Sequence, residues 1–335
     1  MPRKLRILLL ATLVLLGLAT LTGLFFFVGR SPPPPPLPNP NGYDDFLSAA
    51  ALLTGDVANA PSLDQDGLRA LVSTNAESLR LLRLGLTRGC SVPTDSAITN
   101  MSGLLNDLAN LKSLARLLEE EGRLAEMEHR YGDAARSYVD AIRFGNETSR
   151  GAFIINRLVG VACEAIGGSP LSKLVPNLNR EEAGSVVSEL AKIDATRVSW
   201  AEVRRNEDRF SQYQLRKAFN PLAWVMTRWQ RQRSLQQAEM RHKRVIAHER
   251  LLAVELALRC YRYEKAAAPA RLDDLVTNYL SHVPLDPFGA KPLSYRPLGT
   301  NWLLYSVGSD GTDDGGRPAG RALPAKGDIL FDSSW

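Results

Sequence analysis

Residues 104–118 read LLNDLANLKSLARLL, and this stretch sets the expectation for most of the chain. Its leucines return every three or four positions, which is the period of one face of an α-helix. The same spacing recurs upstream at Leu68, Leu71, Leu79, Leu82 and Leu86. Strict alternation of apolar and polar residues is absent from this part of the sequence, and helix breakers cluster between the leucine runs. We therefore predict an α-helical body over residues 43–233 and a long helix over 234–265.

One segment of this body resembles a tetratricopeptide repeat. Ala134, Tyr138 and Ala141 stand at the spacing of the small-aromatic-small positions in the second helix of that repeat. Only one copy is found, whereas a stacked array needs about three units to bury a core. A single helical hairpin that crosses closely through alanines is the favoured interpretation. Gly145-Asn146 and Gly167-Gly168 are predicted to end helices.

The N-terminal part contains an uncharged apolar run over residues 7–29. At about 1.5 Å per residue a helix of this length spans roughly 35 Å, enough to cross the hydrocarbon core of a membrane. Arg3, Lys4 and Arg6 precede the run and only Arg30 follows it closely, so the N-terminal stub 1–6 is expected in the cytoplasm. We predict an uncleaved signal anchor. A cleaved signal peptide is the alternative, which the bulky aromatics at 25–27 disfavour.

A proline-rich linker follows the apolar run. Seven prolines lie within residues 31–40, which favours an extended polyproline II spacer of roughly 30 Å. We therefore predict a single-pass protein of the inner (cytoplasmic) membrane, with membrane lipid around its N-terminal helix. The Pro-rich linker covers 30–42, and the bulk of the chain is expected in the periplasm or another extracytoplasmic compartment.

The net charge of +5 is not spread evenly along the chain, because the excess of basic residues is concentrated in particular segments. Residues 40–202 carry 16 basic and 22 acidic side chains, whereas residues 203–250 carry 12 basic and 4 acidic ones. Nucleic acid is therefore not expected as a partner. The basic stretch also holds candidate membrane-interface residues, namely Trp224, Arg228, Trp229 and Arg231. The alternative is that the aromatic side chains pack into the body while the arginines face solvent.

The sequence changes character after the long helix. Its most specific pieces are Pro284-Leu285-Asp286-Pro287-Phe288-Gly289 and Leu304-Tyr305-Ser306-Val307-Gly308-Ser309-Asp310-Gly311. Over residues 251–331 this order resembles the C-terminal domain of the major pseudopilin of type II secretion systems. The resemblance implies a helix, a proline-containing turn, a small antiparallel sheet and an acidic calcium-binding loop. The rest of the chain does not match that family, since it lacks the processing motif and residues 30–250 separate the apolar run from this domain.

The residues themselves also predict a small sheet. Residues 293–295 and 302–307 favour strands joined by a turn over 297–301, and residues 329–331 can add a third strand. The fold class is therefore α+β: a predominantly helical body, one N-terminal transmembrane helix, and a C-terminal part over 234–335 with a small antiparallel sheet. Asp286 is assigned to structure, as a carboxylate that caps nearby amides in a turn.

The loop between the second and third strands is rich in Gly and Asp. Asp310, Asp313, Asp314 and Asp328 place four carboxylates around it, and a hard cation with oxygen ligands would relieve their repulsion. The resemblance implies that Asp310, the backbone oxygen of Val307 and the Asp328 region match calcium ligands. Asp313 and Asp314 are candidates by proximity. The alternative is a solvated Asp-Gly loop without a metal.

Signals for catalysis are sparse. No nucleophile elbow, Walker loop, His-Glu-x-x-His motif or Cys-x-x-Cys pair occurs. His242 and His248 are six residues apart, so they are expected on different faces of a polar helix surface rather than on one metal. Cys90, Cys163 and Cys260 allow either one disulfide with a free thiol or three isolated thiols.

We therefore expect a non-enzymatic protein that serves protein interaction or scaffolding at the bacterial cell envelope. The partner is expected to be another envelope protein, bound by the helical body. One alternative is an accessory component or regulator of a type II secretion or pilus-like machine. A further alternative is an unrecognised hydrolase, which would show a cleft with converging polar residues of shifted pKa.

Overall fold

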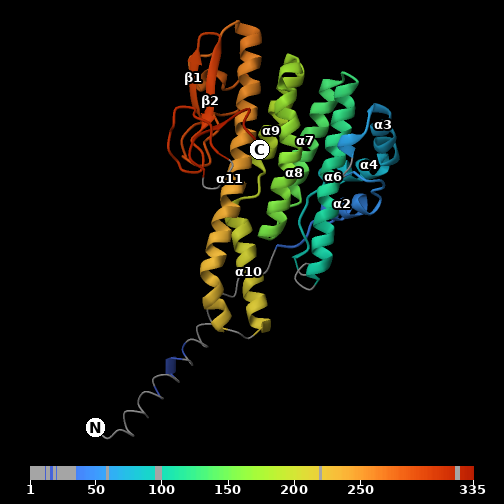
Figure 1. Cartoon of the computed structure of the whole chain (residues 1–335), viewed down its shortest axis with the longest axis vertical. Helices are drawn as coiled ribbons and strands as arrows, with labels where there is room; N and C mark the ends of the chain where they lie inside the picture. Colours follow the sequence, from blue (N-terminus) through green and yellow to red (C-terminus); the bar gives the residue numbers. More distant parts are fainter. Residues whose placement is uncertain are drawn as a thin grey trace, which may run out of the picture. The chain divides into compact units, whose positions relative to one another are not determined.

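The computed structural model describes residues 12, 16–17, 20, 35–57, 60–94, 100–218, 221–320 and 325–335, with side chains of 212–231 outside the description. Two compact units are present, Met1–Pro36 and Leu37–Trp335 (Figure 1). The predicted membrane segment 7–29 lies almost wholly outside the described residues. The few described positions in it are helical, and the Thr20 hydroxyl donates to the Leu16 carbonyl at 2.8 Å.

The second unit is mainly helical, as the leucine spacing predicts. Its α-helices are α2 (Gly42–Ala51), α3 (Gln65–Thr74), α4 (Ala76–Leu86), α6 (Met101–Met127), α7 (Tyr131–Glu147), α8 (Ile154–Leu174), α9 (Arg180–Ala195), α10 (Trp200–Ala218) and α11 (Pro221–Lys265). Short 3-10 turns occupy η1 (Ala60–Ser62), η2 (Val175–Asn177) and η3 (Leu272–Leu275). The long helix begins at Pro221 rather than at 234, so it runs unbroken through the expected boundary at 233.

Several helices begin at a side chain that satisfies their first free amides. The Asp64 carboxylate accepts from Gly67 N at 2.9 Å and starts α3. Asn179 starts α9 with a full capping box, because its side chain accepts from Glu182 N while the Glu182 carboxylate accepts from Asn179 N. These local contacts fix where α9 starts, and α9 forms one wall of the candidate site described below.

Helices α7 and α8 form the closely packed hairpin that Ala134, Tyr138 and Ala141 predict. All three residues are buried. A Cβ atom built on Gly145 of α7 would lie 2.5 Å from the carbonyl oxygen of Gly160 in α8, so the two backbones touch. α7 ends at Glu147, one residue after Gly145-Asn146, so the predicted stop there is confirmed to within a residue. Gly167-Gly168 lies inside α8, and the prediction that it ends a helix was wrong. The missing side chain of Gly145, in the last turn of α7, also allows the close approach.

The C-terminal part adds a sheet of order β1-β2-β3, all antiparallel, built from β1 (Ser294–Leu298), β2 (Asn301–Ser306) and β3 (Ile329–Leu330). The three predicted strands are confirmed. The β1–β2 turn is shorter than expected, because Leu298 already pairs with Asn301. Gly299 takes a positive φ of 66° in that turn, a conformation that glycine adopts without strain.

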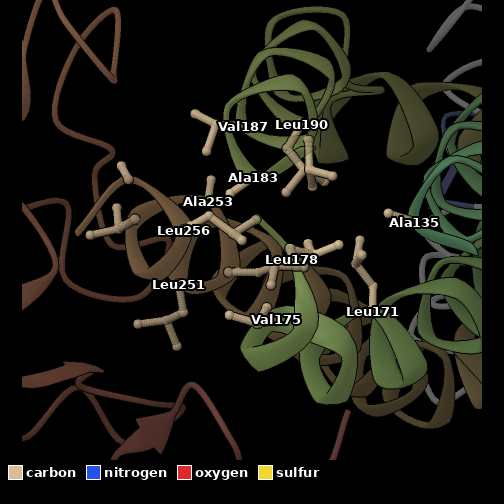
Figure 2. Packing of buried hydrophobic residues seen from close by; sticks show 14 of the residues in the cluster. Ala135, Leu171, Val175, Leu178, Ala183, Val187, Leu190, Leu251, Ala253 and Leu256 are labelled. Atoms are coloured by element: carbon tan, nitrogen blue, oxygen red, sulfur yellow. The ribbon is translucent and has the colours of Figure 1, made fainter. Parts of the chain in front are cut away.

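The core joins the helical body to this sheet. One buried cluster runs from Ala125 and Tyr138 through α9 and α11 to Leu293, Leu304 and Ile329. Figure 2 shows part of it, with Val187 and Leu190 from α9 beside Ala253 and Leu256 from α11. Because α11 contributes to both regions, it fixes the C-terminal sheet against the helical body.

Among the residues that the structure describes, one segment is long and apolar enough to cross a membrane, Ile154–Asn177. It comprises α8 and η2, and α8 packs against α6, α7 and α11. It also carries Arg157 and Glu164, both fully buried. Within this unit we interpret the segment as the interior helix of the bundle.

Candidate functional site

A groove of about 570 Å³ opens between α9, α11 and the C-terminal segment 277–284. Its apolar lining includes Val187 and Leu190 from α9, Ala253 from α11, and Leu280 and Pro284 from the C-terminal segment. These residues come from positions almost a hundred apart in the sequence. The groove therefore exists only when the helical body and the C-terminal part are packed together.

The α9 wall of the groove presents a stripe of small residues. Gly184, Ser188, Ala191 and Ala195 are all exposed and all line the groove. Their spacing of four, three and four residues places them on one helix face, while Ala183, Val186 and Ile193 are buried on another. The exposed face is therefore flat, and a second chain can approach the α9 backbone closely along it.

One end of the groove is charged. Asp194 and Arg250 line it and form an ion pair, with Arg250 Nε 3.1 Å from Asp194 Oδ2. Glu249 also lines it and pairs with Arg197. Arg250 Nη1 donates to the backbone oxygen of Leu285 at 2.7 Å. The charged end thus ties α9 and α11 to the C-terminal segment.

The ion pairs continue into the interior beneath the groove. Glu164 of α8 accepts from Arg157 Nη1 and Nη2 at 2.6 and 2.9 Å, and from Arg197 Nη1 at 3.4 Å. Arg157 and Glu164 are completely buried. Three arginines (157, 197 and 250) thus meet three carboxylates (164, 194 and 249). Burial by itself would lower the pKa of Arg197. The neighbouring carboxylates of Glu249, Glu164 and Asp194 have the larger combined effect, so the pKa of Arg197 is raised.

His242 extends this network, and its expected place on a polar surface was wrong. The ring is buried, and its Nδ1 accepts a hydrogen bond from Arg157 Nε at 2.8 Å. Burial, together with the positive charges of Arg157, Arg197 and Lys243, lowers the pKa of His242 to about 2. His242 is therefore neutral in the folded chain, which the accepted hydrogen bond requires.

His248 is also buried rather than exposed. Its ring stacks on Trp335 with centroids 5.0 Å apart, and burial lowers its pKa to about 3. The Trp335 ring lies against Gly168 of α8, where a Cβ atom would collide with it. The α11 surface around both histidines is thus covered, by α8 and by the last residues of the chain.

The neutral His242 predicts a stability that falls with acid. The unfolded chain takes up a proton on this histidine near pH 6.5, whereas the folded chain does not until about pH 2, so unfolding becomes easier as pH falls below 6.5. Between pH 7 and 5 we expect the wild type to lose about 2 kcal/mol more unfolding free energy than His242→Gln, at about 1.4 kcal/mol per pH unit. Urea denaturation at both pH values measures the difference.

The His242→Gln comparison is needed because Glu249 acts in the opposite direction. Burial raises the pKa of Glu249, so this carboxyl group favours the folded state as pH falls. A glutamine at 242 can still accept from Arg157 but cannot titrate. An exposed, non-titrating position of the same helix supplies the control, and Gln237→Ala should keep the wild-type slope. Equal slopes for the wild type and His242→Gln would contradict the assignment.

The predicted acidic loop is held by hydrogen bonds to its own carboxylates. Asp328 is fully buried and accepts from Asp314 N at 3.3 Å and from Gly316 N at 2.7 Å. Asp313 accepts from the Tyr305 hydroxyl at 2.8 Å, and Asp310 accepts from Thr312 N at 3.1 Å. In the described part of the chain, no three His, Cys, Asp or Glu side chains lie close enough to hold a metal ion. The calcium prediction therefore rests on loop composition and the resemblance.

The structure also shows where three other groups of residues from the sequence analysis lie: Asp286, the cysteines and the candidate membrane-interface residues. The capping role of Asp286 is confirmed, because its carboxylate accepts from Phe288 N and Val307 N at 2.9 and 2.8 Å. The three cysteines are buried free thiols. The candidate membrane-interface residues, Trp224, Arg228, Trp229 and Arg231, lie on α11, and their side chains are outside the described residues.

Sequence reasoning missed the ion network, although one signal was present. Arg157 and Glu164 are opposite charges seven residues apart in an otherwise apolar stretch, so they share a helix face. Charges in an apolar helix are costly unless paired. This spacing could have identified the Arg157–Glu164 pair, but the contributions of Arg197, His242 and Glu249 depend on the fold.

Comparison with known proteins identifies no relative: no protein-family description, curated protein or solved structure matches the chain.

Proposed function

We propose that this chain is a membrane-tethered, extracytoplasmic protein of non-enzymatic type that binds a helix of a partner protein at the bacterial cell envelope. The observation that carries the proposal is the groove between α9, α11 and residues 277–284. Its apolar floor supplies the hydrophobic contact that an amphipathic helix needs, as in other helix-in-groove complexes.

The small-residue stripe favours a helix as the occupant. Gly184, Ser188, Ala191 and Ala195 follow the spacing with which side chains of one helix meet another. Small side chains let helix axes approach closely, as Gly145 and Gly160 already do inside the body. All four residues remain exposed in the folded chain, so this face of α9 is open to a partner helix.

The two carboxylates of the groove, Asp194 and Glu249, each accept from a guanidinium group. Held in this way they position α9 and α11 on either side of the groove, which supports a binding role. The hydrolase stays an alternative, because burial raises the pKa of Glu249 and this residue lines the groove.

The tether rests on the apolar run at 7–29 and the proline-rich spacer that follows it. Together they would anchor the chain in the inner membrane and hold the helical unit clear of the lipid head groups. Protease added to the outer face of cytoplasmic-membrane vesicles with native orientation should digest the chain beyond Arg30. Full protection would contradict this topology.

Site-specific photo-crosslinking in intact membranes tests the groove. A photoreactive amino acid placed at Ser188 and at Ala191 should capture the same protein, and mass spectrometry should map its cross-linked residues to one face of a helix. The matched control is Ala109, an exposed alanine on α6. Ala191→Trp, which fills the groove, should abolish the capture, whereas Ala109→Trp should not. Equal capture from position 109, or cross-links to a non-helical segment, would contradict the proposal.

A second candidate function is an accessory role in a type II secretion or pilus-like machine. The three-stranded sheet and the Asp286-capped turn favour it, because the resemblance over residues 251–331 implies both features. Deletion of the gene should then reduce secretion, and the protein should co-purify with secretion components. Normal secretion after deletion would leave the first proposal in place.

Calcium binding by the acidic loop forms a further part of the proposal. Loop composition and the resemblance suggest Asp310, Asp313, Asp314, Asp328 and the backbone oxygen of Val307 as the oxygen ligands. Their carboxylates would have to move together around the ion, since no three of the described ones lie close enough to hold a metal ion. At calcium a hundredfold above its Kd, we expect binding to stabilise the full chain by about 2.7 kcal/mol. Calcium should therefore raise the melting temperature, and this rise should disappear with EDTA and in Asp310→Ala. It should persist in the control Asp273→Ala, which alters an exposed carboxylate outside the loop. An unchanged melting temperature would argue against the site.

A further inference from the structure

The central strand β2 of the C-terminal sheet is incompletely paired along one edge. β1 pairs with β2 from Asn301 to Tyr305, so that edge of β2 is covered. On the other edge, β3 pairs only with Tyr305 and Ser306. β3 then ends because the chain turns back, with Ser333 N donating to the Leu330 carbonyl at 3.1 Å. Residues 301–304 on this edge have no strand partner among the described residues.

An open pocket of about 280 Å³ lies at this uncovered edge. β2 lines it from Asn301 to Leu304, the end of β3 and the following turn line it with Leu330, Phe331 and Asp332, and α11 lines it with Glu255, Arg259 and Arg262. An unpaired strand edge beside open space is a template for another extended chain. α11 and the turn flank this open space, so the expected occupant is an extended segment that lies along the strand edge.

The charges of the pocket indicate what the segment carries. Arg259 is neutralised by Glu255 at 2.8 Å, and the other Glu255 oxygen accepts from Trp302 Nε1 at 2.7 Å, which fixes the indole ring. Arg262 lies over that ring, 5.0 Å from its centroid. Among the described residues no carboxylate pairs with Arg262. Arg262 Nη1 donates to Asn301 Oδ1 at 3.5 Å, and the remaining N–H groups of this half-buried guanidinium can donate to a carboxylate.

We propose that this pocket binds an extended acidic segment of a partner polypeptide, which adds a short strand along residues 301–304 of β2 and places one Asp or Glu side chain on Arg262. Backbone hydrogen bonds to the strand edge supply general affinity, and the Arg262 contact supplies specificity. Asp332, an exposed carboxylate that lines the pocket, repels a second acidic residue, so one acidic position is expected. This surface is separate from the α9–α11 groove, and the inference does not rest on the function proposed for that groove.

A random dodecapeptide display library, panned on the full chain in lipid nanodiscs, tests the inference. Enriched peptides should share one Asp or Glu within a β-favouring stretch. Arg262→Gln should weaken their binding about tenfold, as expected for loss of a charge-assisted pair. The matched control is Arg271→Gln, whose side chain is 74% exposed and pairs with Asp274, and it should bind as the wild type does. Arg262→Glu should instead enrich peptides with Lys or Arg.

Strand addition has its own readout. Bound peptide should protect the backbone amides of residues 301–304 from hydrogen exchange, which a contact to the Arg262 side chain alone would not do. The inference is overturned if no acidic peptide is enriched, if Arg262→Gln binds equally well, or if residues 301–304 stay unprotected. Self-association of the chain that Arg262→Glu abolishes would assign the edge to a second copy and would also overturn it. Ala191→Trp in the groove should leave peptide binding unchanged.

Discussion

Replacing Glu164 by Gln is expected to destabilise the folded chain by about 3–5 kcal/mol, the cost of leaving a buried charge without its partner. Glu164 is completely buried and accepts two hydrogen bonds from Arg157, at 2.6 and 2.9 Å. The neutral amide would leave the Arg157 guanidinium charged among His242 and Ser149, neither of which carries a negative charge. Urea denaturation of the full chain in detergent micelles, followed by circular dichroism, measures the loss.

A double-mutant cycle separates the pair from general damage to the core. Arg157→Met combined with Glu164→Leu removes both charges and retains apolar volume, so it should cost less than the sum of the two single changes. The exposed control is Glu77→Gln, which breaks the Arg80–Glu77 pair on α4. That pair is solvated on both sides, and we expect no measurable change. Additive single changes in the cycle, or a Glu164→Gln effect as small as that of the control, would refute the interpretation.

Features determined by neighbouring residues were predictable from the sequence. The period of Leu104, Leu108 and Leu111 identifies a buried helix face because side chains three and four apart share a face in any helix. The Asp286 cap was predictable for the same reason, since its carboxylate reaches an amide two residues away. The strand pairing of β1 and β2 likewise depends on a two-residue turn.

Features determined by distant residues were not predictable in this way. A glycine can end a helix or allow another helix to approach, and the sequence around Gly145 does not distinguish these roles. His242 is buried because Arg157, eighty-five positions away, lies beside it. The groove joins α9 to residues 277–284 across α11, so none of its three walls identifies it alone.

Gly145→Ala is expected to destabilise the chain by about 3 kcal/mol, because overpacking a close helix contact moves backbone as well as side chains. The added Cβ would lie 2.5 Å from the carbonyl oxygen of Gly160 and 2.8 Å from Glu164 N. Neither backbone atom can rotate away, so α7 and α8 must separate. Separating the two helices would also disturb the Arg157–Glu164 pair, because both residues lie on α8.

Gly184→Ala is the matched control, because it makes the same change in the interior of another helix. A Cβ atom at Gly184 of α9 meets nothing within 4 Å, so alanine should stabilise the helix by up to about 1 kcal/mol through its higher helix propensity. The two variants should therefore shift the urea midpoint in opposite directions. Such opposite shifts can arise only from what surrounds each glycine, since the intrinsic change from glycine to alanine is identical. Shifts of the same sign would mean that α7 and α8 do not approach through Gly145 and Gly160.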